Sequence, residues 1–207
     1  MDAPFLELSF YVGTAGVKPA LEALVANLPP GILPRKLRLP NMVGLIEEAE
    51  EIEVLGGVVV LRTEGEAFCG AARTKVGRLK KLGRKAYERF VEVVDTIPCF
   101  YGAILVEYSL EEPGVLRQDS RSLAFRNFFL SEESLGPVAV QQAEVLAGND
   151  AFVEKRKRGI YVSMSSEFNP KGGHVNPLEA QERSTKIAAI VGRAVKSSST
   201  SLDWRKG

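Results

Sequence analysis

The sequence is poor in the residues on which several classes of protein depend. Of its 207 residues, one is histidine (His174) and two are cysteine (Cys69 and Cys99). These three soft ligands lack the paired Cys-x-x-Cys or His-x-x-x-His spacing of structural zinc sites, so we expect no bound metal. Two cysteines are also too few for the disulfide framework of a small secreted protein.

Long apolar runs are missing as well. No stretch approaches the roughly 20 apolar residues that cross a bilayer. The opening Met1-Asp2-Ala3-Pro4 is acidic where a secretion signal is basic, and no apolar core follows it. We therefore expect a cytoplasmic protein that makes no contact with a membrane.

The motifs of common enzyme classes are also missing. The chain has no G-x-x-x-x-G-K-[ST], no G-x-G-x-x-G after a strand, no G-x-S-x-G and no set of kinase motifs. Neither an ATPase, a Rossmann dehydrogenase nor a serine hydrolase is supported. The sequence favours a non-catalytic protein without a cofactor.

What is present is the composition of a globular protein, with 45% hydrophobic and 26% charged residues. A chain of this length can bury a core without metals or disulfides. We expect a single domain over residues 1–196. The serine-rich residues 197–207 lack periodicity and are expected to form a flexible tail.

Hydrophobic patterns predict the order of elements in the first half. Alternation over residues 5–12 predicts a strand, and a helix is expected to start near residues 16–18. Two strands joined by Gly56-Gly57, a helix over residues 76–96 and a strand over residues 101–108 follow. Strand-helix-strand-strand-helix-strand is the order of the ferredoxin-like split βαβ core, so we expect an α+β fold of that kind.

Further elements extend this core. Strands are expected over residues 123–130 and 160–164, with a helix over residues 138–147 between them. A long final helix is expected from Pro177, with Asn176 as its N-cap. Residues 115–196 either complete the first sheet or form a second lobe. The short turn at residues 111–114 favours completion.

Charges are balanced in number but segregated along the chain. The 27 Lys and Arg against 26 Asp and Glu leave a net charge of +1. A basic block occupies residues 73–89, and an acidic run extends from Glu47 to Glu53. The candidate contact residues are the cations of the basic helix and of a second short cluster: Arg78, Lys80, Lys81, Arg84, Lys85, Arg89, Lys155, Arg156, Lys157 and Arg158.

The basic helix opposes its own dipole. Cations crowd its N-terminal half, which is expected to present them on its outer faces, whereas Glu92 and Asp95 lie near its end. The arrangement therefore does not serve helix stability. Either these cations contact a phosphate backbone or an acidic protein, or they form a solvated face neutralised by the acidic run. The position of that run decides between these interpretations.

Cys69 and His174 form a second, different hypothesis. One thiol and one base suffice for a nucleophilic pair, and the cations after Cys69 would lower the pKa of its thiol. The alternatives are a small buried thiol for Cys69 and an ordinary capped loop around His174.

These observations favour a binding protein that acts through contacts with another protein. By analogy of size and class, it resembles partner or inhibitor subunits such as immunity proteins. A nucleic-acid binder and a small cysteine-dependent enzyme are the alternatives, and the opposed charge blocks also allow a homo-oligomer.

Overall fold

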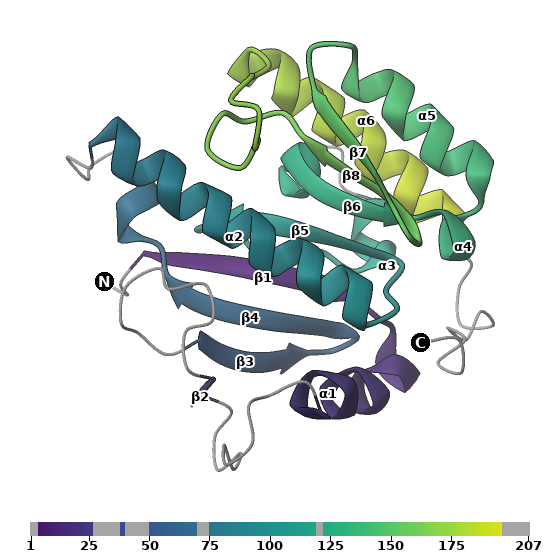
Figure 1. Ribbon diagram of the computed structural model, residues 1–207. Helices are drawn as coiled ribbons and strands as arrows, with labels where there is room; N and C mark the ends of the chain where they lie inside the picture. The colour runs from purple at the N-terminus through teal and green to yellow at the C-terminus, as the bar shows by residue number, and fades with distance from the viewer. Residues whose placement is uncertain (1–3, 27–37, 40–49, 70–74, 119–121, 196–207) are drawn as a thin grey trace.

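The structure, a computed structural model, describes residues 4–26, 38–39, 50–69, 75–118 and 122–195. It has a mixed α+β fold built on one antiparallel sheet of eight strands, in the order β2-β3-β4-β1-β5-β6-β8-β7 (Figure 1). The expected tail at residues 197–207 lies outside the described residues, as do Glu47 and Glu48 of the acidic run.

The elements follow one another from β1 near the N-terminus to a long C-terminal helix. The strands are β1 (Phe5–Tyr11), β2 (Arg38–Leu39), β3 (Glu50–Leu55), β4 (Val58–Glu64), β5 (Tyr101–Val106), β6 (Asn127–Ser131), β7 (Phe152–Arg156) and β8 (Gly159–Ser163). The α-helices are α1 (Val17–Ala26), α2 (Val76–Thr96), α3 (Pro113–Leu116), α4 (Glu132–Leu135), α5 (Pro137–Ala147) and α6 (Pro177–Ala194). Short 3₁₀ turns are η1 (Thr14–Gly16), η2 (Glu66–Phe68) and η3 (Ala124–Arg126).

The alternating pattern of β1 separates the two faces of the sheet. As predicted, the even positions of β1 lie on one face, where α1 and α2 cover them. Phe10 of β1 stacks on Phe90 of α2, with 5.0 Å between ring centroids. Side chains at odd positions point to the opposite face. The helix α2 therefore lies on one defined side of the sheet.

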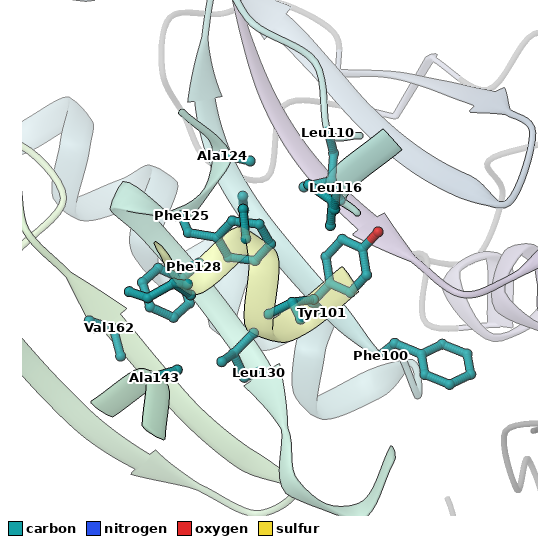
Figure 2. Close-up of a cluster of buried hydrophobic side chains, with 14 of the residues drawn as sticks. Phe100, Tyr101, Leu110, Leu116, Ala124, Phe125, Phe128, Leu130, Ala143 and Val162 are labelled. Atoms are coloured by element: carbon teal, nitrogen blue, oxygen red, sulfur yellow. The ribbon is translucent and has the colours of Figure 1, made fainter. Parts of the chain in front are cut away.

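The second face carries a separate aromatic core beneath α5 and α6. Tyr101, Phe125, Phe128 and Leu130 are fully buried there, and Figure 2 shows them gathered around one point. Ring centroids of Tyr101 and Phe125 lie 5.8 Å apart. The prediction that Phe125, Phe128 and Phe129 belong to the core is confirmed.

The predicted hairpin between β3 and β4 is confirmed. Gly56 has a φ of 59°, which glycine adopts without strain in a tight turn. The N–H of Gly57 donates to Oε1 of Glu112 at 2.9 Å. This bond ties the turn to the segment that follows β5.

The strands of residues 115–196 extend the same sheet, because β6 pairs with β5 and β8 pairs with β6. The predicted final helix begins as expected, since the N–H of Leu178 donates to Oδ1 of Asn176 at 3.0 Å. The strand predicted over residues 123–130 is wrong in its first half. There the N–H of Phe125 donates to Oγ of Ser184 on α6, and this tertiary bond holds η3 in a turn.

Candidate functional site

Helix α2 carries the feature that the sequence marked as a contact surface. Its buried face, which includes Leu82, Ala86, Phe90 and Val93, packs on the sheet as the 3–4 spacing predicts. Gly83 lets the backbone of Glu167 approach closely, since a Cβ at this position would lie 1.9 Å from the carbonyl oxygen of Glu167. The helix is thereby fixed in rotation, and its opposite side faces outward.

The N-terminal half of α2 presents a group of exposed cations, which we call the basic surface: Lys75, Arg78, Lys80, Lys81 and Arg84. Arg84 pairs with Glu88 one turn later at 2.8 Å. The other four pair with no carboxylate of the described residues. The first turn of α2 contains no acid, and no side chain caps it. Positive charge and the positive end of the helix dipole therefore coincide.

The C-terminal half of α2 has its charges paired within the molecule. Arg89, predicted on an outer face, is only 7% exposed and bonds Glu92 at 3.0 Å. Arg89 is therefore not one of the exposed cations of the helix, because its aliphatic stem belongs to the packed face. Lys85 is half-buried and engaged, so it too is set apart from the exposed cations.

The second basic cluster lies in the β7–β8 hairpin, beside the C-terminal half of α2. Arg156 pairs with Asp95 of α2, and the hydroxyl of Tyr87 donates to Glu154. Burial and this hydrogen bond raise the pKa of Tyr87. Lys155 and Lys157 are exposed, whereas Arg158 is half-buried. The hairpin therefore docks on the acidic half of the helix and does not continue the basic surface.

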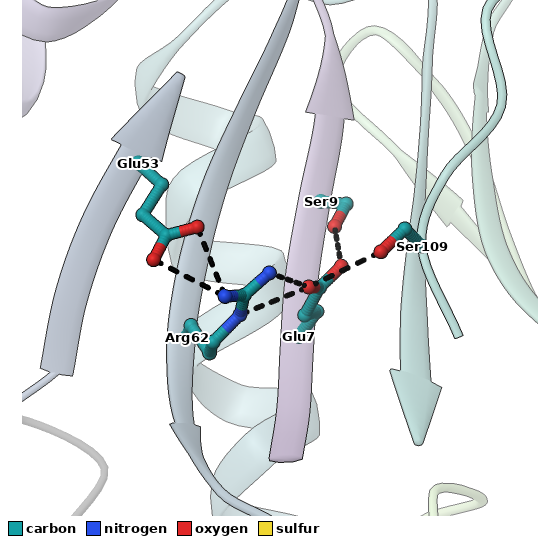
Figure 3. A network of polar contacts seen from close by, with 5 residues as sticks. All are labelled: Glu7, Ser9, Glu53, Arg62 and Ser109. Atoms are coloured by element: carbon teal, nitrogen blue, oxygen red, sulfur yellow. Dashed lines mark hydrogen bonds and ion pairs between the residues drawn. The ribbon is translucent and has the colours of Figure 1, made fainter. Parts of the chain in front are cut away.

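Glu53 is the residue of the acidic run whose side chain the structure describes, and it lies on the face of the sheet opposite to α2. Ile52 of β3 packs in the core beneath α1 and α2, so Glu53 projects to the opposite face. There Glu53 pairs with Arg62 at 3.1 Å, and Arg62 in turn bonds the buried Glu7 at 2.6 Å (Figure 3). Glu53 therefore does not neutralise the basic surface.

Sequence reasoning did not single out Glu7 or Arg62. Glu7 has no exposed area, and Oγ of Ser9 donates to it at 3.2 Å. Because Glu7 occupies an odd position of an alternating strand, the pattern predicts that its side chain faces solvent. A detectable hint was the basic residue of β4, because Arg62 lies directly opposite Glu7 in the strand register.

Among the described residues, the charged neighbours that affect the Cys69 thiol are acidic. The thiol is half-buried and donates to the carbonyl of Gly65 at 3.5 Å. Burial and the neighbouring Glu107 and Glu66 raise the pKa of the Cys69 thiol. His174 is exposed in the loop before α6, and the structure describes no hydrogen bond between these two residues. Nothing in this geometry activates a thiolate.

The described residues contain neither a membrane-spanning helix nor a cluster of metal ligands. No helix there is long and apolar enough to cross a membrane. No group of three or more His, Cys, Asp or Glu in the same part of the chain could hold a metal ion. Comparison of the sequence and the structure with protein-family models, curated proteins and solved structures gives no match.

Proposed function

We propose that this chain is a non-catalytic protein that binds an acidic surface of another protein through its basic surface on α2. The observation that carries the proposal is the set of four exposed cations without a carboxylate partner in the described residues. Lys75 is the N-cap and Arg78 lies in the first turn of the helix, where a cation costs about 0.3–1 kcal/mol at low salt. A partner that supplies acidic groups would offset this cost on association.

The size of the surface favours a protein over a duplex. Lys75 to Arg84 spans about 14 Å of helix at 1.5 Å per residue. Further along the helix, Glu88 and Glu92 are each paired with an arginine, so the exposed cations do not continue along a phosphate backbone that carries one charge per about 1.7 Å. A compact acidic patch on a protein matches this short surface, and such complementarity sets association rate and specificity.

A partner of different sequence is favoured over a second copy of this chain. In a homo-oligomer, the acidic run would have to meet the basic surface of the neighbour, but its Glu53 is already engaged by Arg62. We infer that the chain is an inhibitor-type or complex subunit. Immunity proteins are comparable in size and fold class, and this comparison is an analogy only.

We also infer that residues 5–106 have a ferredoxin-like core. Beside the two-residue strand β2 at the edge, the four longer strands of this region lie in the order β3-β4-β1-β5, all antiparallel. The helices α1 and α2 connect them and contribute to the core on one face. This order supports the split βαβ arrangement, which by itself carries no activity.

Affinity capture from the native extract, treated with nuclease, tests the proposal. The wild-type chain is compared with Arg78→Gln/Lys80→Gln/Lys81→Gln, which we call the α2 variant. The matched control is Lys18→Gln/Lys186→Gln/Arg193→Gln, which removes the same three charges from exposed positions of α1 and α6. We expect the same protein to be captured by the wild type and the control and lost from the α2 variant.

The α2 variant must remain folded for this comparison, and we expect its free energy of unfolding to be equal or higher, because the removed cations oppose the dipole. Equal capture by all three chains would overturn the proposal. A gel-shift titration with a generic DNA duplex at 50 mM and 200 mM salt tests the nucleic-acid alternative. A shift that weakens steeply with salt and is lost in the α2 variant would replace the proposed partner by nucleic acid.

A further inference from the structure

A pocket opens where two neighbouring strands of the sheet, β5 and β6, separate. Pairing of β5 with β6 ends at Ala103 and Phe128, although β5 continues to Val106. The space between the diverging strands is a pocket of about 220 Å³. Its walls include Phe68, Val106, Tyr108, Arg126, Asn127 and Phe168. The pocket uses none of the residues of the basic surface.

Arg126 in this wall has an incomplete set of partners. One of its terminal nitrogens donates to the carbonyl of Pro177 at 3.5 Å, a long bond. Its Nε is buried and makes no hydrogen bond, and no carboxylate of the described residues pairs with the guanidinium. A buried donor on a cation is costly to leave unpaired. The site therefore lacks an acceptor that carries negative charge.

Asn127, the next residue, also lines the pocket and carries a second donor group. Asn127 is buried, with only 6% of its surface exposed. Oδ1 accepts from the hydroxyls of Ser163 at 2.8 Å and Ser165 at 2.7 Å, which fixes the orientation of the amide. Its Nδ2 has no acceptor among the described residues. The amide is thus held ready to donate to a molecule in the pocket that it lines.

The remaining walls are largely apolar. Phe68 of η2 and Phe168 stack with 5.2 Å between ring centroids, and Ile104, Val106 and Leu123 add aliphatic surface. The volume equals that of about seven water molecules at about 30 Å³ each, below the roughly 300 Å³ of the smallest drug-sized sites. A single ring with one short substituent matches this size.

We propose that this pocket binds a small aromatic monocarboxylate. The carboxylate would accept from Arg126 and Nδ2 of Asn127, and the ring would lie against Phe68 and Phe168. A planar carboxylate suits the fork geometry of a guanidinium. A phosphate dianion is disfavoured, because the described residues of the wall include one cation, Arg126, and also the acid Glu167. This inference is independent of the protein partner proposed above.

Titration of the isotope-labelled full chain with benzoate, followed by NMR chemical shifts, tests the inference. We expect saturable shifts of Arg126, Asn127 and residues beside them, and at least about tenfold weaker binding of the neutral analogue benzamide. Arg126→Met keeps the aliphatic stem and removes the donors, so we expect a loss of at least about tenfold in affinity for benzoate. Asn127→Asp places a like charge in the site and should weaken binding similarly, while its oxygens still accept from the two serines.

Arg158→Met is the matched control. Arg158 also has a buried nitrogen without a partner, but it lies outside this pocket. We expect its benzoate affinity to equal that of the wild type. Dispersed spectra of each variant show that it is folded. Benzamide binding as tight as benzoate, unchanged affinity in Arg126→Met, tighter binding of phenyl phosphate, or no shifts at 10 mM benzoate would each overturn the proposal.

Discussion

At the scale of single residues, the buried ion pair of Glu7 and Arg62 should contribute more to stability than the exposed one beside it. Both acids bond the same guanidinium, but Glu7 is fully buried whereas Glu53 is about one-third exposed. We expect Glu7→Gln to lower the free energy of unfolding by about 2–3 kcal/mol. Glu53→Gln should lower it by less than about 1 kcal/mol. Urea unfolding measures both, and equal losses would contradict this assignment.

Cysteine reactivity tests the enzyme alternative directly. Burial and two carboxylates raise the pKa of Cys69, and burial raises the pKa of Cys99 to about 12. Near pH 7, we expect iodoacetamide to label Cys69 more slowly than free cysteine and to leave Cys99 unlabelled. Glu107→Gln should accelerate labelling of Cys69. Labelling of wild-type Cys69 faster than free cysteine would restore it as a candidate nucleophile.

The residues of the two candidate sites differ in how well the sequence predicts them. Exposure of Lys80 and Lys81 follows from their positions outside the apolar stripe of α2. Burial of Arg89 does not follow, since the local pattern does not give the width of the packed face of the helix. Asn127 meets Ser163 and Ser165 only through the register of β6 and β8, which no local pattern encodes.

At the scale of elements, α2 gives a paired test of how it packs. Alanine favours a helix over glycine by about 0.8–1.0 kcal/mol. At Gly83, the added Cβ would collide with the backbone of Glu167, so we expect Gly83→Ala to destabilise the protein by about 2 kcal/mol. At Gly77, nothing lies within 4 Å, so Gly77→Ala should stabilise by about 0.5 kcal/mol. Thermal unfolding measures both changes in stability. A change of the same sign in the two variants would contradict the close contact at Gly83.

For elements with a strong hydrophobic period, the sequence predicts the first and last residues to within a few positions. It does not predict elements that lack such a period. The helix expected over residues 76–96 is α2, and the helix expected over residues 138–147 is α5. Strand β7 was missed, because Glu154, Lys155 and Arg156 look like a solvated charged cluster. Its strand conformation comes from pairing with β8, which a local sequence pattern does not reveal.

At the scale of the whole molecule, buried phenols and a buried thiol make stability depend on alkaline pH. Burial raises the pKa of Tyr87, Tyr101, Tyr161 and Cys99 in the folded chain. The unfolded chain keeps ordinary values, so it releases these protons first as the pH rises above about 9. The folded state then binds more protons, and the free energy of unfolding falls with pH.

Urea unfolding at pH 8 and pH 10.5 measures this effect, and we expect a loss of a few kcal/mol between them. Tyr161→Phe removes one of the groups and should reduce the difference, whatever its effect at pH 8. Equal stability at the two pH values would show that these groups ionise alike in both states.

Across the whole molecule, charge is separated, with the basic surface on one side of the sheet and Glu53 engaged on the other. The association rate constant of the captured partner at 50 mM and 300 mM salt measures whether the basic surface drives binding. We expect a fall of at least about tenfold for the wild type and the control, because salt screens exposed charges beyond about 10 Å at 0.1 M. The α2 variant should associate slowly at both concentrations. A wild-type rate that is independent of salt and equal to that of the α2 variant would contradict the account.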